Sequence, residues 1–210
     1  NSELIIASIL QPLIQGFGMR GVYICASRSA AEIIQTLDSI GIDTSGVQFI
    51  DTVSSGFIGG TEVPYPNIRF VDSPIMLESI MLQTLYHLSE YTETGNFVIL
   101  DSVNALSIYN EKRMLAEYLH TFINTFRARE VLTAIINVPD QTPPGVLANL
   151  DLYCTDLIDR GQVVIHWGEN VEPVQFDPDD EEFYGEMGSI GSVKFDTILT
   201  GSPLNDGSIP

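Results

Sequence analysis

Basic residues are scarce in this sequence. Only 9 lysines and arginines stand against 28 aspartates and glutamates, which gives a formal net charge of −19. A charge of this sign repels phosphate backbones and anionic lipid, both of which are attracted by basic patches. The composition therefore argues against nucleic acid as a direct ligand. It leaves open whether the acidic surface serves solubility alone or also attracts a basic protein partner.

Cysteine is also rare, and long apolar runs are absent. The two cysteines, Cys25 and Cys154, are far apart within apolar stretches, which favours small buried side chains over a disulfide framework or a metal site. No run approaches the roughly 18 apolar residues of a membrane-spanning helix. No charged leader precedes a cleavage-like site. We therefore expect a cytoplasmic protein that does not insert into membranes.

The pattern of hydrophobic residues alternates between helical and extended periodicity. Apolar residues recur at helical spacing in four segments, at residues 4–17, 30–40, 75–88 and 114–126. Short and almost uniformly apolar runs lie between them, at residues 21–26, 47–50, 97–100 and 131–138. Strands that are buried on both faces have this composition, and strands that alternate with helices pair in parallel. The sequence therefore predicts an α/β fold with a mainly parallel central sheet and helices on both faces.

Local signals complete this outline. Ser29 and Glu32 have the spacing of a capping box at the start of a helix. Residues 54–69 are rich in Gly, Pro and Ser, and we expect an irregular connection there. Residues 156–159 and 163–167 are predicted to be two closing strands.

The chain divides into two regions by composition. We expect residues 1–167 to form the α/β domain and residues 168–210 to form an acidic C-terminal tail or docking arm. The second region holds 10 of the 28 acidic residues and a single basic one, Lys194. This composition is typical of a solvated tail. Its interspersed apolar residues, such as Phe183 and Tyr184, would equally suit an arm that docks on a partner.

Asp101 is the principal candidate for a functional residue. It follows directly after the four apolar residues 97–100, and open parallel sheets bind ligands beyond the carboxyl ends of their strands. In phosphate-transferring enzymes, an acid at this position holds the magnesium ion that bridges the nucleotide phosphates. Aspartate also follows strands simply to start a turn or to cap a helix. The sequence around Asp101 allows both interpretations, a magnesium ligand and a turn or cap residue.

A longer stretch around Asp101 carries a resemblance to a known family. The run Asn96-Phe-Val-Ile-Leu-Asp-Ser-Val-Asn-Ala-Leu-Ser-Ile-Tyr-Asn110 resembles the Walker B strand and following segment of the RecA/KaiC-like P-loop ATPase superfamily. The order of elements over residues 1–166 is similar as well, and it most resembles divergent archaeal KaiC-like members that lack the phosphate-binding loop. The resemblance implies that Asp101 and Ser102 are vestigial Walker B residues. It also implies a homo- or hetero-oligomer.

Two departures from the family pattern bear on activity. The phosphate-binding loop GxxxxGK[ST] does not occur in this sequence. The acidic residue that activates water in KaiC-like enzymes is replaced by Ala26-Ser-Arg-Ser29. Without the loop's lysine and amide groups, triphosphate binding is weak. We therefore expect no catalytic residue, no resident metal and no cofactor, and a regulatory or structural subunit that binds a protein partner.

An alternative interpretation remains open. The first strand and the phosphate-binding loop of such a fold would lie upstream of Asn1. In that case the protein is a nucleotide-binding ATPase or ATP-dependent switch that uses ATP and magnesium, with Asp101 as the magnesium ligand.

Overall fold

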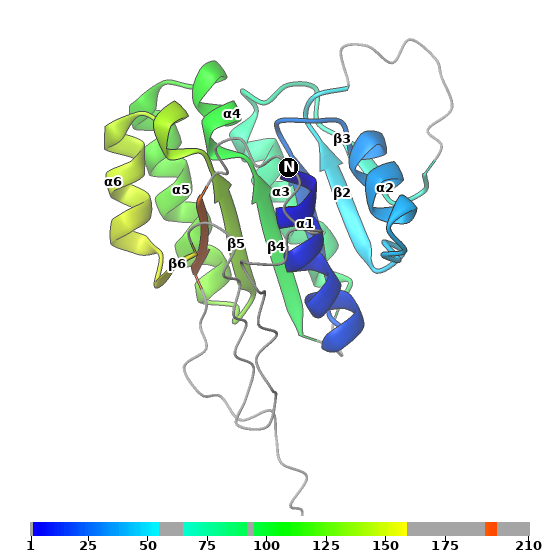
Figure 1. The fold of residues 1–210 in the computed structure, drawn as a ribbon. Helices are drawn as coiled ribbons and strands as arrows, with labels where there is room; N and C mark the ends of the chain where they lie inside the picture. Colours follow the sequence, from blue (N-terminus) through cyan, green and yellow to red (C-terminus); the bar gives the residue numbers. More distant parts are fainter. Residues whose placement is uncertain (1, 55–64, 92–94, 159–191, 197–210) are drawn as a thin grey trace, which may run out of the picture.

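The computed structural model describes residues 2–54, 65–91, 95–158 and 192–196. Within these ranges, seven strands form one sheet (Figure 1). From one edge to the other they are β3 (Ile68–Phe70), β2 (Val47–Asp51), β1 (Arg20–Cys25), β4 (Asn96–Asp101), β5 (Leu132–Asn137), β7 (Ser192–Asp196) and β6 (Asp156–Ile158). The first five pair in parallel, whereas β7 pairs antiparallel with both β5 and β6.

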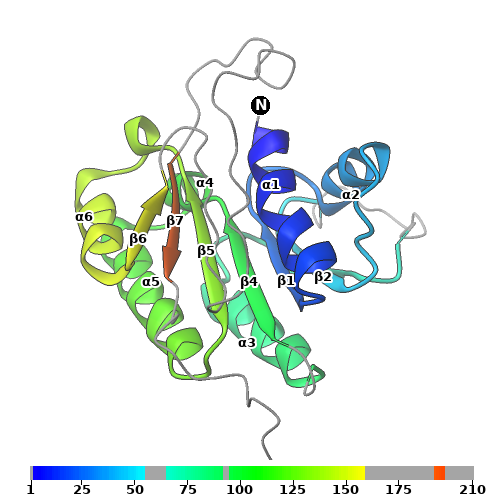
Figure 2. The ribbon, with the colours of Figure 1, turned by 60° about the horizontal axis from the view of Figure 1, so that its bottom comes forward.

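Helices cover both faces of this sheet (Figure 2). One face carries α1 (Ser2–Gln11), its π-helical extension η1 (Pro12–Gly16) and α2 (Ala30–Ser39). The other face carries α3 (Leu77–Ser89), α4 (Val103–Tyr109), α5 (Lys112–Arg127), the short η2 (Pro139–Gln141) and α6 (Pro144–Tyr153). In the described part of the chain, every helix is too short or too polar to cross a bilayer. The predicted fold class, a mainly parallel sheet with helices on both faces, is confirmed.

Each face of the sheet has its own apolar core, which explains the uninterrupted apolar runs of the central strands. Along β4, Phe97 and Ile99 pack on the side of α1 and α2. The intervening Val98 and Leu100 pack on the side of α3 and α5. All four side chains are fully buried. A strand with two buried faces has no position left for a polar residue until its end.

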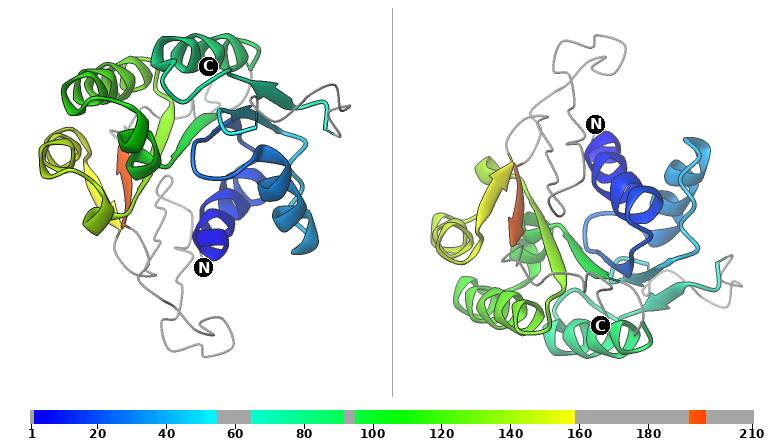
Figure 3. Two further views of the ribbon diagram at one scale, coloured as in Figure 1. Left: turned by 90° about the horizontal axis from the view of Figure 1, so that it is seen from above. Right: turned by 90° about the horizontal axis from the view of Figure 1, so that it is seen from below.

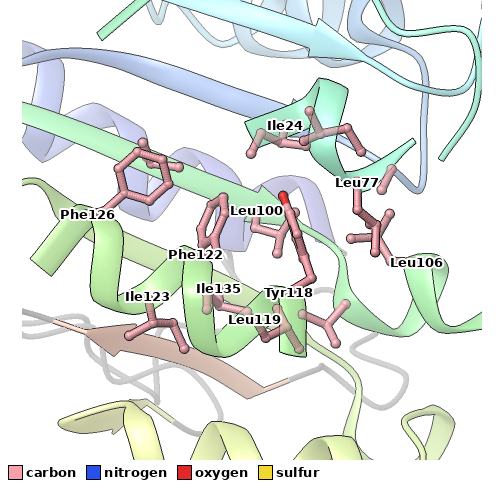
Figure 4. Packing of buried hydrophobic residues seen from close by; sticks show 14 of the residues in the cluster. Ile24, Leu77, Leu100, Leu106, Tyr118, Leu119, Phe122, Ile123, Phe126 and Ile135 are labelled. Atoms are coloured by element: carbon pink, nitrogen blue, oxygen red, sulfur yellow. The ribbon is translucent and has the colours of Figure 1, made fainter. Parts of the chain in front are cut away.

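Helix α5 shows why the clearest periodicity in the sequence is helical. Its apolar stripe faces the sheet and packs over β4 and β5 (Figure 4). Phe122 and Phe126, one turn apart, meet edge to face with ring centroids 4.7 Å apart. The solvent side of the same helix carries Arg113 and Glu117, which form an ion pair. Burial of each large apolar side chain of the stripe contributes roughly 1.5–3 kcal/mol.

Three segments differ in detail from the sequence-based expectations. The segment 54–69 was predicted to be irregular, but Ile68–Phe70 forms β3, a strand too short to show a periodicity. The two-turn helix α4 was not predicted for the same reason. Strand β7 lies within residues 168–210, where a tail or docking arm is expected, and it pairs with β5. The rest of that region and the predicted strand at 163–167 lie outside the described residues.

Candidate functional site

The order of the strands creates a switch point between β1 and β4. The chain runs outward from β1 through β2 to β3, then returns to the middle of the sheet as β4. The connection after β1 leads to α2 on one face, and the connection after β4 leads to α4 and α5 on the other. Open α/β sheets bind ligands at such a point, beyond the carboxyl ends of the strands. Asp101, the last residue of β4, lies here opposite Cys25, the last residue of β1.

The carboxylate of Asp101 is engaged by donors from the protein itself. The Tyr23 hydroxyl donates to Oδ2 over 2.6 Å, and the Ser27 hydroxyl donates to Oδ1 over 3.1 Å. Tyr23 is fully buried, and only 4% of Asp101 is exposed. Both carboxylate oxygens therefore already have a hydrogen-bond partner in a space that excludes most water.

Burial determines the ionisation of this pair. Removal from water raises the pKa of Asp101 above its ordinary value, against the hydrogen bond from Tyr23, the positive charge of Arg28 and the hydrogen bond from Ser27. Burial also raises the pKa of Tyr23 well above its ordinary value, and the neighbouring charge of Asp101 adds to this. The phenol therefore keeps its proton and serves as the donor.

Ser102, the second candidate from the sequence, is buried beside Asp101 at the start of α4. The two residues are joined by a cis peptide bond. The Ser102 side chain makes no capping hydrogen bond to α4. The carboxylate of Asp101 accepts from Tyr23 and Ser27 rather than from the backbone of this helix. The interpretation of Asp101 as a helix cap is therefore wrong, because its side chain points back toward β1.

A second buried carboxylate, Asp51, was missed by the sequence reasoning. It ends β2 and is 1% exposed. In the strand register it lies opposite Cys25, which in turn lies opposite Asp101, so three ionisable side chains end neighbouring strands. The signal that would have identified Asp51 is the same as for Asp101, an aspartate directly after an apolar run.

The side chain of Asp51 lies at the N-terminus of α2 and accepts a hydrogen bond from it. Its Oδ2 accepts from the backbone N–H of Ala30, the first residue of that helix, over 2.8 Å. Its Oδ1 accepts from the backbone N–H groups of Val53 and Ser54 over 2.8 and 2.9 Å. The Ser54 hydroxyl donates to Oδ2 over 2.8 Å. Free N–H groups at the start of a helix bind phosphate and other anions. Here the anion is a carboxylate of the protein itself.

The predicted capping box lies at the same helix end and is confirmed. The backbone N–H of Glu32 donates to the Ser29 side chain, and the Glu32 carboxylate accepts from the backbone N–H of Ser29. A second carboxylate therefore faces the turn after β1. Among the described residues, the two carboxylates outnumber the one cation at this turn, Arg28, and this balance disfavours the binding of a phosphate group.

Cys25 lies between the two strand-end carboxylates. Burial raises the pKa of its thiol well above the ordinary value, and the charges of Asp51 and Asp101 add to this. Because the thiolate is the reactive form, this cysteine is chemically inert. Its interpretation as a small buried side chain is confirmed.

The residues present do not fit a magnesium ion at Asp101. Mg²⁺ requires oxygen ligands with free lone pairs in near-octahedral geometry and room for its waters. Asp101 is 4% exposed, and its two oxygens already accept from Tyr23 and Ser27, so little space is left beside them for a hydrated ion. Within the described residues, no three His, Cys, Asp or Glu side chains are grouped to hold a metal ion.

Two solved structures are distantly similar to this chain. No protein-family model and no curated protein sequence matches the chain. A KaiC-like protein of the archaeon Pyrococcus horikoshii is 13% identical with a TM-score of 0.42, over 64% of this chain and 67% of that one. A protein named as a methyltransferase of Thermobifida fusca is 12% identical with a TM-score of 0.48, over 93% of this chain and 80% of that one. Similarities at this level carry no argument about function.

Proposed function

We propose that this chain is a non-hydrolytic regulatory or structural subunit of RecA/KaiC-like architecture that acts by binding a protein partner. The observation that carries the proposal is the environment of Asp101. The carboxylate that would hold a magnesium–nucleotide complex is buried and bonded to Tyr23 and Ser27. Each oxygen accepts one hydrogen bond and keeps a further lone pair, but a metal ion would have to reach these lone pairs in a position that is almost closed to water and where burial disfavours charge.

The helix N-terminus beside this carboxylate supports the same conclusion. A phosphate group bound there would have to replace the carboxylate of Asp51. This carboxylate accepts four hydrogen bonds, one from the first residue of α2 and three from the turn that follows β2. The phosphate group would also approach the carboxylate of Glu32. Replacement of satisfied internal bonds by a repelled anion is unfavourable. These internal bonds support a structural role for the switch point.

Two features favour a protein as the ligand. The net charge of −19 disfavours nucleic acid and anionic membranes. Large apolar side chains are also exposed on α3, α4 and α5, as in surfaces that proteins bury against one another.

Titration calorimetry with ATP and MgCl2 tests the proposal. We expect no binding heat for the wild-type chain, or for the variants Asp101→Ala and Asp38→Ala, at nucleotide concentrations up to about 1 mM. A dissociation constant of about 1 mM corresponds to a binding free energy of roughly −4 kcal/mol. Asp38 is an exposed aspartate on α2 and serves as the control. Submillimolar affinity that Asp101→Ala abolishes and Asp38→Ala retains would contradict the proposal.

The alternative function is that of a nucleotide-binding ATPase or switch. One observation favours it: α1 begins at the carboxyl edge of the sheet and runs toward the opposite edge, as a helix after a phosphate-binding loop does (Figure 1). A coding sequence that places GxxxxGK[ST] directly before Asn1 would favour this function. The longer chain is then expected to bind ATP with slow or no turnover, because Ala26-Ser-Arg-Ser29 offers no acidic base.

A further inference from the structure

Among the described residues, seven large apolar side chains are exposed on α3, α4, the first turn of α5 and the residues directly before α3. We call this set the α3–α5 patch: Ile75, Met76, Leu82, Tyr86, Ile108, Tyr109 and Met114. Their exposed fractions run from 43% for Met76 to 76% for Ile108. The two views of Figure 3 place α3, α4 and α5 together, opposite α1 and α2.

Contacts between the elements make the patch continuous. The Asn110 side chain at the end of α4 donates to the backbone carbonyl of Pro74 over 3.0 Å. This bond brings the exposed end of α4 next to the exposed residues before α3. Leu82 and Tyr86 extend the patch along α3, because residues four apart share one face of a helix. Met114 extends it onto the first turn of α5.

The size of the patch matches what a stable protein interface needs. At roughly 200 Å² for each large side chain, the exposed fractions amount to on the order of 800 Å². The largest apolar patch on a typical monomer is about 300–600 Å². A standard interface buries about 800 Å² on each partner. The patch is therefore large enough to form one complete side of such an interface.

The charges at its border suit a second copy of the chain. The net charge of −19 makes two copies repel one another over most of their surface. The border of the patch carries both signs of charge, namely the exposed acids Glu78, Glu90, Glu111 and Glu117 and the exposed Lys112 and Arg113, of which Arg113 pairs with Glu117. A two-fold contact presents the same surface twice, so it needs both signs of charge on one patch. The α3–α5 patch meets this requirement.

We infer that the α3–α5 patch is the interface of a symmetric homodimer. This inference deepens the proposed function and rests on it, since it names a second copy of the chain as the protein partner. The buried Asp101 and Asp51 lie at the switch point and take no part in the contact.

Sedimentation equilibrium tests the inference. We expect the wild-type chain to be dimeric at about 10 μM, and the double variant Tyr86→Glu/Ile108→Glu to be monomeric, with a dissociation constant raised at least about 100-fold. The control is Leu152→Glu, because Leu152 is 72% exposed but lies on α6 outside the patch. This control is expected to remain dimeric. Far-UV circular dichroism checks that all three chains are folded.

A wild-type chain that stays monomeric at 100 μM would overturn the homodimer, as would a double variant that dimerises like the wild type. A control that dissociates as readily as the double variant would also overturn it. The calorimetric test with ATP is independent of these results. Nucleotide binding by a dimer overturns the proposed function alone, and a monomer that binds no nucleotide overturns the homodimer alone.

Discussion

The hydroxyl of Tyr23 donates a 2.6 Å hydrogen bond to Oδ2 of Asp101 across the neighbouring strands β1 and β4. The two residues are 78 positions apart in the sequence, and both are buried. The distance is in the range of O–H···O⁻ bonds of about 2.5–2.7 Å, which are roughly twice as strong as neutral ones. This bond engages the carboxylate at the switch point, the place where open parallel sheets bind ligands.

Replacement of Tyr23 by phenylalanine removes the donor and leaves a buried carboxylate oxygen with one partner fewer. We expect Tyr23→Phe to lower the free energy of unfolding by about 1–3 kcal/mol at pH 7, as measured by urea denaturation. Tyr118→Phe is the control, because the hydroxyl of the buried Tyr118 has no hydrogen-bond partner among the described residues, and its change is expected within about 0.5 kcal/mol. Equal stability of Tyr23→Phe and the wild type would show that the bond contributes nothing.

The raised pKa of Asp101 predicts a pH dependence of stability. The folded state holds the proton of Asp101 more tightly than the unfolded state does. The stabilisation that results is complete below the unfolded pKa of about 4 and is lost as the pH rises through the raised folded pKa. Asp101→Asn cannot ionise. Relative to the wild type, its free energy of unfolding is therefore expected to increase from pH 4 upward.

Urea denaturation at constant ionic strength between pH 4 and 8 measures this difference, because contributions of other groups cancel between the two chains. The exposed Asp38→Asn serves as the control and is expected to parallel the wild type. A free energy of unfolding of Asp101→Asn, minus that of the wild type, that stays constant or falls with rising pH would contradict the prediction.

Asp51 is predicted to be structural. Asp51→Ala leaves the N–H groups of Ala30, Val53 and Ser54 without their acceptor, so we expect a loss of about 2–4 kcal/mol in urea denaturation. The capping-box variant Ser29→Ala removes a single acceptor and is expected to cost about 1 kcal/mol. If Asp51→Ala proved no more destabilising than Ser29→Ala, Asp51 would not be the main anchor of α2.

Replacement of Gly21 by a larger residue is predicted to destabilise the fold for steric reasons. A Cβ atom at this position would lie closer than 3.0 Å to the backbone carbonyl oxygen of Phe97 on the neighbouring strand. Gly21→Ala is therefore expected to lower the thermal midpoint and the free energy of unfolding by about 1–3 kcal/mol. Gly145→Ala in α6 is the matched control, because a Cβ there meets nothing within 4 Å. This control is expected to be neutral or stabilising by up to about 1 kcal/mol, and loss of stability in both variants alike would remove the steric explanation.

Features with a local pattern were predictable, and features without one were not. The stripe of α5, the apolar run of β4 and the capping box of Ser29 and Glu32 repeat at spacings that backbone geometry imposes, so the sequence indicates them directly. Strand β3 and helix α4 contain three and seven residues, too few for a period to show. Asp51 carries the same signal as Asp101, an aspartate directly after an apolar run, and the sequence does not show that its carboxylate reaches α2.

By itself, the sequence determined the α/β class, the two-sided burial of the central strands and the position of Asp101 at the end of an apolar run. These properties follow from periodicity and composition within short windows. The tertiary structure alone decided that Tyr23 and Ser27 meet Asp101, and that Asp51 reaches the first N–H of α2. Such contacts depend on the order and register of the strands, which bring together residues far apart in the chain and leave no trace in the local pattern around either partner.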